Sequence, residues 1–308
     1  MKNRFEFNSR LLKKLGYSKY TYYDTTIYGV STLKKPRNNT LIFADVLNSC
    51  DVENLKCVKN SILILNKDYC EIDLKENYVI YVDRPRKEYA KILKFILDNE
   101  ININEEYSFK DGYFVGRNVV IKKNTVIEPF VFIDSNSVIG RNCIIKSGAK
   151  IRSNTIIEDN CIIKENSVIG SDGFGVERDS DGTTYKIPHL GGVKIGKFVE
   201  VGALSVIAQG TIEPTVIQDY VKIDDCAFIA HNSKIGRGTF VIANSEISGS
   251  VEIGGNCWIS PNVCIKDGVK IGNNSVLGMG AVVLEDIKEN SVVVGNPAKF
   301  LKNRDSLT

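Results

Sequence analysis

The chain has 308 residues, of which 43% are hydrophobic and 25% charged, so it can bury the core of more than one domain and is not a disordered chain. Its 40 Lys and Arg nearly balance its 37 Asp and Glu, which excludes the strongly basic surface typical of nucleic-acid-binding proteins. No apolar stretch approaches the length of a membrane span and the N-terminus lacks a signal-peptide pattern, so we expect a cytoplasmic protein. The eight cysteines include no Cys-x-x-Cys pair, which indicates reduced thiols and no zinc site.

Residues 1–105 have the pattern of a small α/β domain. The apolar runs at 40–45, 61–65 and 78–82 predict strands. Residues 85–98 have helical spacing, with Pro85 at the start.

A six-residue repeat follows and decides the architecture of the second domain. Every sixth residue from 121 to 169 is isoleucine, and the period returns as aliphatic residues at 195–207 and 217–283. A small or β-branched residue, such as Cys143 or Cys161, lies two positions before each, and Gly or Asn recurs where a tight corner needs a positive φ. This period predicts a three-sided coil of short strands, stacked at about 4.8 Å per circuit. The predicted domain spans 106–290, with a loop excursion at 170–192 and a short tail at 291–308.

These repeats resemble those of the hexapeptide-repeat acyltransferases, which implies a left-handed parallel β-helix. The stretches "IYGVSTLKKPRNNTLIFA", "GSDGFG", "KIPHLG" and "IDDCAFIAHNSKIG" resemble motifs of the UDP-3-O-acylglucosamine N-acyltransferases of lipid A synthesis. The resemblance covers about nine tenths of the chain. It implies that the first domain binds a nucleotide sugar, with Phe43 matching an aromatic residue that stacks on the base.

Two departures from this family favour a different substrate. The stretch after Phe43, "ADVLNSCD", lacks a second aromatic residue, and the chain ends in "GNPAK" and a short tail instead of a helical segment associated with acyl carrier protein. "GNPAK" resembles the terminus of acetyltransferases that use coenzyme A. We therefore expect an N-acyltransferase that uses acyl-CoA as co-substrate, with no permanent cofactor, and acts on a nucleotide-linked amino sugar. Enzymes that acylate dTDP-4-amino-4,6-dideoxyhexoses, including dTDP-4-amino-4,6-dideoxyglucose and the anthrose-pathway substrate, combine these traits.

His231 is one of two histidines and is the expected general base. A sugar amine arrives mostly as an ammonium without a lone pair, and imidazole is suited to removing a proton near neutral pH. His231 falls two residues after the inward Ile229, beside Asn232 at a corner, so its ring is expected to project outward. Family trimers have their active sites in the crevices between subunits at such edges, and we therefore expect a homotrimer.

Gly249 lies one circuit after His231 and matches the family's oxyanion glycine. Its backbone N–H would lie about one strand spacing from the base and could bind the carbonyl oxygen. Asp224 matches the family's carboxylate that orients the imidazole, with its neighbour Asp225 as a rival; either could instead be a solvated turn residue.

Further residues are expected to contact substrates. In the loop excursion, Asp172, Gly173 and Phe174 resemble the family's loop over the acceptor site, although a plain turn would also explain them. At His189 the family commonly has glutamine, and we expect loop structure or substrate contact there instead of acid–base work. Near the end of the coil, Gly278 and Gly280 would let a pantetheine arm run close to the backbone, although corner geometry alone would also explain them. Lys299 would meet a coenzyme A phosphate, or is simply an exposed lysine on a terminal turn.

Other functions remain open. The family enzyme of lipid A synthesis, with acyl carrier protein as donor, and a hexapeptide O-acyltransferase are the main alternatives. A coil used only as a scaffold would explain the repeats but not the pairing of His231 with Gly249. A zinc carbonic anhydrase on this coil needs three histidines, and the chain has two.

Overall fold

The computed structural model describes residues 5–17, 24–100 and 107–304. The chain forms two compact units, Met1–Asn104 with Phe174–Pro188, and Glu105–Gly173 with His189–Thr308. Among the described residues, no helix is both long and apolar enough to cross a membrane. The domain limits expected from the sequence remain a prediction.

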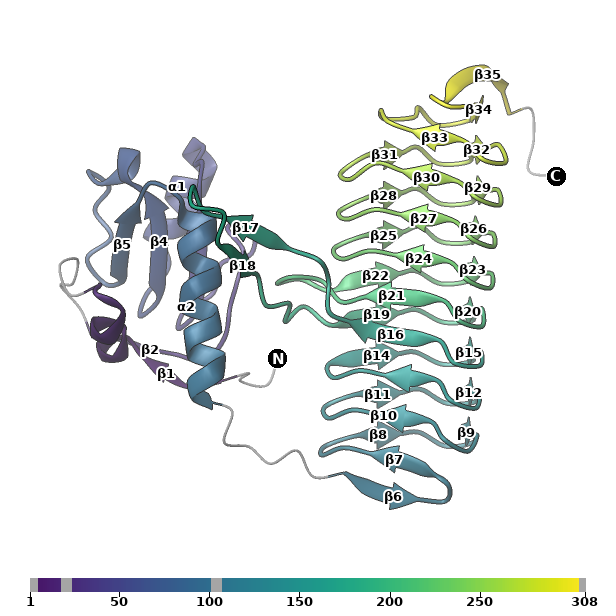
Figure 1. Ribbon diagram of the computed structural model, residues 1–308, viewed down its shortest axis with the longest axis horizontal. Helices are drawn as coiled ribbons and strands as arrows, with labels where there is room; N and C mark the ends of the chain where they lie inside the picture. Colours follow the sequence, from purple (N-terminus) through teal and green to yellow (C-terminus); the bar gives the residue numbers. More distant parts are fainter. Residues whose placement is uncertain (1–4, 18–23, 101–106, 305–308) are drawn as a thin grey trace. The chain divides into compact units, whose positions relative to one another are not determined.

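The first unit is built on a three-stranded parallel sheet in the order β3-β4-β5 (Figure 1). The apolar runs and the helical spacing of the sequence correctly predicted these strands and the helix α2. The sheet buries aliphatic side chains such as Ile64 and Ile80 completely, because the strands are covered on both faces. Its elements are β1 (Phe7–Asn8), η1 (Ser9–Leu15), β2 (Thr26–Ile27), β3 (Leu41–Ala44), α1 (Ser49–Lys56), β4 (Ile62–Asn66), η3 (Lys67–Tyr69), β5 (Tyr78–Val82) and α2 (Pro85–Glu100).

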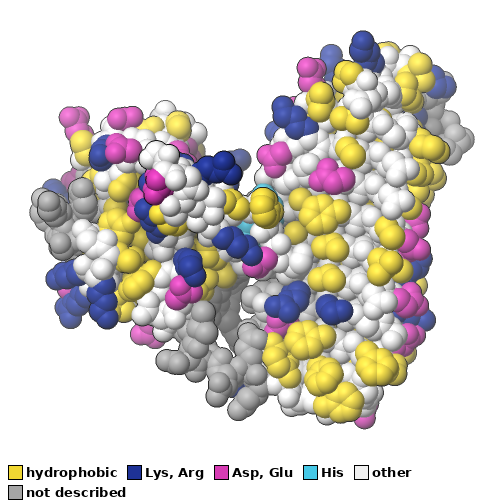
Figure 2. Space-filling model, in the orientation of Figure 1, with side chains coloured by type: hydrophobic (Ala, Val, Ile, Leu, Met, Phe, Trp, Pro, Cys, Tyr) yellow, Lys and Arg dark blue, Asp and Glu magenta, His cyan; other side chains and the backbone are white. Residues whose placement is uncertain are grey.

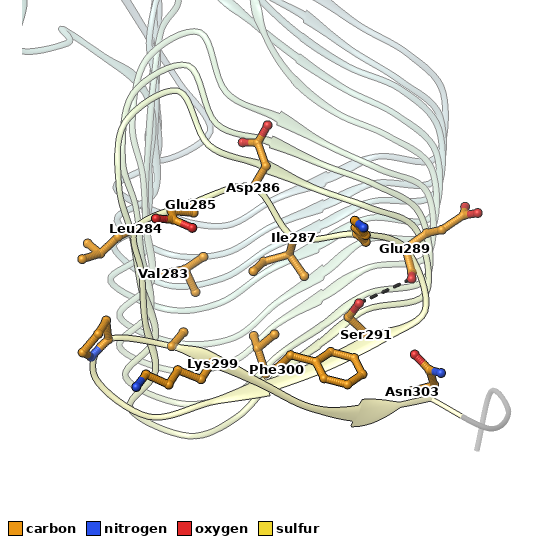
Figure 3. A pocket seen from close by; sticks show the side chains of 14 residues that line it. Val283, Leu284, Glu285, Asp286, Ile287, Glu289, Ser291, Lys299, Phe300 and Asn303 are labelled. Carbon is orange, nitrogen blue, oxygen red and sulfur yellow. Dashed lines mark hydrogen bonds between the residues drawn. The ribbon is translucent and has the colours of Figure 1, made fainter.

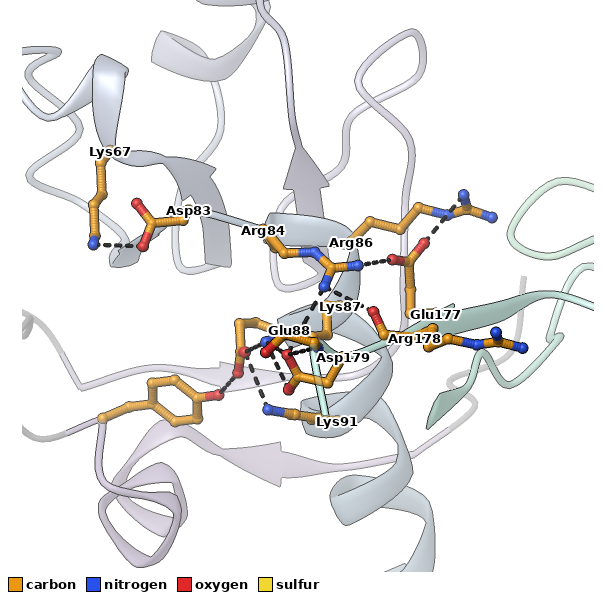
Figure 4. Close-up of polar contacts among 12 residues, drawn as sticks. Lys67, Asp83, Arg84, Arg86, Lys87, Glu88, Lys91, Glu177, Arg178 and Asp179 are labelled. Carbon is orange, nitrogen blue, oxygen red and sulfur yellow. Dashed lines mark hydrogen bonds and ion pairs between the residues drawn. The ribbon is translucent and has the colours of Figure 1, made fainter. Parts of the chain in front are cut away.

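A hairpin of β17 (Val176–Arg178) and β18 (Thr184–Lys186) completes the first unit, although its residues come from the middle of the chain. Ion pairs join it to the first turns of α2 (Figure 4). Glu177 lies 2.9 Å from Arg84 and 3.2 Å from Arg86, and Asp179 lies 3.1 Å from Lys87. These contacts hold the predicted excursion on the helix instead of leaving it as a free loop.

The second unit is a left-handed parallel β-helix. The six-residue period indicated the three-sided coil, and the resemblance implied its handedness. Three sheets of ten, eight and ten strands form its sides. The first sheet contains β6 (Ser108–Lys110), β7 (Tyr113–Val115), β10 (Phe132–Ile133), β13 (Lys150–Ile151), β16 (Val168–Ser171), β21 (Val206–Ala208), β24 (Phe228–Ile229), β27 (Glu246–Ile247), β30 (Cys264–Ile265) and β33 (Val282–Val283). The second contains β8 (Val120–Ile121), β11 (Val138–Ile139), β14 (Thr155–Ile157), β19 (Val193–Ile195), β22 (Thr215–Ile217), β25 (Lys234–Ile235), β28 (Glu252–Ile253) and β31 (Lys270–Ile271). The third contains β9 (Val126–Ile127), β12 (Ile144–Ile145), β15 (Ile162–Ile163), β20 (Glu200–Val201), β23 (Lys222–Ile223), β26 (Phe240–Val241), β29 (Trp258–Ile259), β32 (Val276–Leu277), β34 (Ser291–Val294) and β35 (Lys299–Asn303).

The interior of the coil is a column of the repeated aliphatic residues. Ile169 pairs with Ile207 and Ile207 with Ile229, so the register survives both interruptions of the period. Cys143 and Cys161 are fully buried at the small inward position, in agreement with their expected role as small hydrophobic residues.

Asparagines make many of the corners. Asn124, Asn142 and Asn160 all have φ near +60°, which asparagine tolerates better than most residues. Their side-chain amides form a ladder, with hydrogen bonds of 3.2 Å from Asn124 to Asn142 and from Asn142 to Asn160. The corners are therefore stabilised along the stack as well as within each turn.

The outer surface of the first coils carries a group of hydrophobic side chains, visible in yellow in Figure 2. Phe109 and Phe130 are exposed, and the rings of Phe109 and Phe114 lie 5.0 Å apart. Farther along, Phe240 and Trp258 project from neighbouring strands with ring centroids 5.6 Å apart.

Candidate active site

His231 and Gly249 lie at the same corner of successive coils. The pairing of β24 with β27 places Gly249 next to His231 along the stack, and the pairing of β27 with β30 places Asp267 next to Gly249. A Cβ atom on Gly249 would lie 2.9 Å from His231 Nε2 and 2.6 Å from Asp267 Oδ1. Those distances are too short for a side chain at position 249. Glycine at this position therefore lets the imidazole lie flat against the coil.

The backbone N–H of Gly249 is available as a hydrogen-bond donor. It has no acceptor within the ranges that the structure describes, whereas the Gly249 carbonyl accepts the N–H of Gly268 at 2.9 Å. The N–H of Ser250 donates to the His231 carbonyl at 2.8 Å, which holds the two corners together. An unoccupied donor beside an imidazole is suited to stabilising negative charge on a substrate oxygen.

Asn232 holds the imidazole from its other side. Its amide Nδ2 lies 2.9 Å from His231 Nδ1. The amide is itself fixed by Thr211, whose N–H donates to Oδ1 at 2.7 Å and whose hydroxyl accepts from Nδ2 at 3.1 Å. Asn232 adopts φ +62°, the left-handed conformation that this corner requires.

The two carboxylates considered for orienting His231 lie at a different corner. Asp224 accepts the N–H of Asp225 at 2.9 Å and of Ala243 at 3.3 Å, while Asp225 accepts the N–H of Ala203 at 2.8 Å. Neither contacts His231 among the described residues, because strand β24 separates the two corners. The orienting contact expected from Asp224 is instead made by Asn232.

His189 packs directly against His231. Their ring centroids lie 5.0 Å apart at 61°, and the His189 side chain is almost completely buried. A Cβ atom on Gly173 would lie 2.6 Å from His189 Nε2 and 2.8 Å from His231 Cβ. The two ends of the excursion thus meet at the candidate base, and glycine at 173 makes room for both histidines.

Asp172 and Phe174, the two other excursion residues expected to contact substrate, belong to different units. Asp172 accepts a hydrogen bond of 2.9 Å from the Gln209 amide. Gln209 follows β21 at the corner adjacent to His231. Phe174 belongs to the first unit, and its side chain is 88% exposed.

Phe43 lies on β3 of the first unit, and its side chain is half-buried. Its ring lies 4.6 Å from that of Tyr89 on α2, at 38°. Tyr89 is fully buried, so it supports one face of Phe43. The aromatic neighbour of Phe43 therefore comes from the helix and not from the stretch that follows Phe43.

The residues expected to bind the acyl donor lie near the end of the coil. A Cβ atom on Gly278 would lie 2.6 Å from a Val294 methyl group, and Gly280 turns a corner at φ +67°, so packing and turn geometry account for both. Lys299 lines a terminal pocket of about 830 Å³ under strand β35, together with Ile287 and Phe300 (Figure 3).

Sequence reasoning named Asn232 only as a corner residue and missed its contact with the imidazole. It also missed Thr211, Gln209 and Asp267 as residues near His231. The eighteen-residue circuit would have found Asp267, which lies two circuits after the histidine. Thr211 and Gln209 lie in a circuit in which paired residues are 22 positions apart, as Ile207 and Ile229 are, instead of the regular 18.

Comparison with known proteins agrees with this architecture. The family model for bacterial transferase hexapeptide (six repeats) matches residues 118–153, 136–171 and 250–285. Crystal structures of UDP-N-acetylglucosamine acyltransferases from Bacteroides fragilis and Campylobacter jejuni superpose with TM-scores of 0.58 and 0.57. Each is 23% identical and covers 64% of this chain and 75% of its own, a likeness that concerns the fold.

Two curated relatives match in sequence. The UDP-3-O-acylglucosamine N-acyltransferase of Campylobacter lari is 38% identical over 268 residues, which are 83% of this chain and 84% of that protein. UDP-3-O-acylglucosamine N-acyltransferase 2 of Legionella pneumophila (strain Lens) is 48% identical over 86 residues, which are 28% of this chain and 25% of that protein.

Proposed function

Because the chain belongs to the UDP-3-O-acylglucosamine N-acyltransferase family, we propose that it transfers an acyl group from a thioester to the amine of UDP-3-O-acylglucosamine. The observation that carries this proposal is the 38% identity over most of both chains, combined with the pairing of His231 and Gly249 at one corner. These relatives do not support the dTDP-4-amino sugar or the anthrose-pathway substrate expected from the sequence. The UDP-linked acceptor replaces them.

In the proposed reaction, His231 is the base and Gly249 is the oxyanion donor. Nε2 takes a proton from the sugar ammonium, and the amine then attacks the thioester carbonyl carbon. The carbonyl oxygen gains negative charge, which the Gly249 N–H stabilises. The C–N bond forms, the C–S bond breaks, and the leaving thiolate takes the proton from His231. The second proton that the nitrogen loses as it becomes an amide passes to solvent.

We assign the acceptor's base to Phe43 and the space around the amine to Asp172, Gly173 and His189. Phe43 offers a partly exposed ring backed by buried Tyr89, which suits stacking on a uracil. His189 lies against the candidate base, where it would contact the sugar next to the amine.

Acyl carrier protein is the donor that we favour over the acyl-CoA expected from "GNPAK". Strand β35 lies at the edge of its sheet and exposes Lys299, Phe300, Leu301 and Lys302. A mixed basic and apolar surface suits an acidic protein carrier, whereas coenzyme A needs only a groove and phosphate contacts. The two donors are distinguished by measuring kcat/KM for the same acyl group carried by acyl carrier protein and by coenzyme A. A higher kcat/KM with coenzyme A would favour the acyl-CoA donor expected from the sequence.

We also propose a cytoplasmic homotrimer. All eight cysteines are free, in keeping with a reducing compartment. The exposed Phe240 and Trp258 on one side of the coil suit burial against a second copy, which would enclose the corner site from outside. Light scattering that shows an active monomer would contradict the trimer.

The activity is tested by incubating the purified protein with UDP-3-O-acylglucosamine and acyl carrier protein charged with a 3-hydroxyacyl group. Mass spectrometry should show the N-acylated product. UDP-N-acetylglucosamine offers only hydroxyl groups and serves as the test for an O-acyltransferase. Transfer to that acceptor, without transfer to the amine, would overturn the proposal.

A further inference from the structure

Thr211 decides which end of the Asn232 amide faces the imidazole. The Thr211 N–H can only donate, so the atom 2.7 Å away must be the amide oxygen. The NH₂ group therefore faces His231 Nδ1 at 2.9 Å. An amide NH₂ is also only a donor, so Nδ1 must accept. In the neutral ring the single proton then resides on Nε2.

Asp267 favours the same tautomer from the opposite side of the ring. Its Oδ1 and His231 Nε2 both lie less than 3 Å from the position of a Gly249 Cβ, so the two atoms are no more than about 6 Å apart. The Asp267 carboxylate has no hydrogen bond or ion pair within the described ranges. A carboxylate at neutral pH can only accept, which favours a protonated Nε2.

We propose that Asn232 is a positioning residue that keeps resting His231 in the Nε2–H tautomer, so that Nε2 becomes basic only when the acceptor amine arrives. This inference rests on the proposed N-acyl transfer. An ammonium group entering beside Nε2 brings donors to that atom and neutralises Asp267. Both changes favour moving the ring proton to Nδ1, provided that the Asn232 amide turns its oxygen toward Nδ1 and gives up the hydrogen bond from the Thr211 N–H. Nε2 is then free to act as the base.

The resting tautomer protects the acyl donor from water. In the side reaction, water would attack the thioester carbonyl carbon and give its proton to Nε2. A C–O bond would form, the C–S bond would break, and the thiolate would take the proton back. A protonated Nε2 cannot accept the proton, so hydrolysis is slow while no amine is bound.

The substitution Asn232→Asp keeps the shape of the side chain but replaces the NH₂ donor that faces Nδ1 with a carboxylate oxygen, which accepts. One carboxylate oxygen still accepts the Thr211 N–H, and the other accepts a proton-bearing Nδ1. Aspartate also tolerates the left-handed backbone at this corner. We expect thioester hydrolysis without acceptor to rise roughly two- to tenfold, as expected when one hydrogen bond changes its preference. Asn244→Asp, which places the same charge at another corner with φ +58°, should leave hydrolysis unchanged.

Nitrogen NMR of ¹⁵N-histidine-labelled resting enzyme tests the tautomer directly, at a pH where the rings are neutral. The chain has two histidines, so His189→Gln assigns the His231 signals. We expect a protonated Nε2 in the wild type and a protonated Nδ1 in Asn232→Asp. A protonated Nδ1 in the wild type would overturn the inference, as would unchanged hydrolysis in a folded Asn232→Asp. The spectrum is recorded without substrate, so it tests the tautomer of His231 whether or not the proposed acceptor is correct.

Discussion

The imidazole of His231 occupies the space in which a side chain on Gly249 would begin. Cε1 and Nε2 lie 2.8 and 2.9 Å from that point, so the ring rests directly against the backbone of the next coil. The close contact brings the candidate base and the free N–H of Gly249 to the same reacting centre.

Gly249→Ala is expected to displace the ring and reduce turnover at least a hundredfold, because the base leaves its position beside the oxyanion donor. The coil should remain folded, with a loss of about 1–3 kcal/mol from crowding. Steady-state kinetics and thermal unfolding measure the two effects. Gly29→Ala is the matched control, because a Cβ at that position would meet nothing within 4 Å. It should change neither turnover nor thermal stability. Near-normal turnover in Gly249→Ala would remove the glycine from the mechanism.

His231→Ala and His231→Gln are each expected to lose about a hundred- to ten-thousandfold in kcat, the usual contribution of a general base. Glutamine keeps a polar group of similar reach but cannot take up a proton at neutral pH. Circular dichroism should show that both variants keep the β-helix. Activity within a few-fold of the wild type in either folded variant would point to a base supplied by the substrate.

The sequence predicted the parts of this protein that depend on a regular period. Ile133, Ile151 and Ile169 stack as their spacing of one circuit indicated, because each coil repeats the same inward position. The contacts of His231 beyond Gly249 were not predicted. Asn232 orients the ring only because Thr211, which lies in a circuit longer than the regular 18 residues, fixes its amide. Asp224 was chosen by resemblance, and the corner at which it lies became evident only from the fold.

Phe43→Ala is expected to raise KM for the nucleotide sugar about tenfold or more and to leave kcat nearly unchanged. Stacking of a base on an aromatic ring contributes about 1–3 kcal/mol, and this contact is the same in ground and transition states. KM for the acyl donor serves as the internal control and should not change. A fall in kcat with constant KM would place Phe43 outside the nucleotide site.

Asp179→Asn is expected to loosen the hairpin of β17 and β18 from α2. The ammonium of Lys87 and the N–H of Ser180 lower the pKa of the Asp179 carboxyl below its ordinary value. A carboxyl with a lowered pKa in the folded state stabilises the docked hairpin at neutral pH, and this contribution is lost as pH falls through that lowered pKa, below about 4. Hydrogen exchange at pH 7 should therefore be faster in residues 176–186 of the variant, and this difference from the wild type should shrink as pH falls below about 4. Asp181→Asn is the matched control, because Asp181 accepts the N–H of Thr183 within the hairpin's own turn. Equal exchange in Asp179→Asn and the wild type would show that the ion pair with Lys87 does not hold the hairpin on the helix.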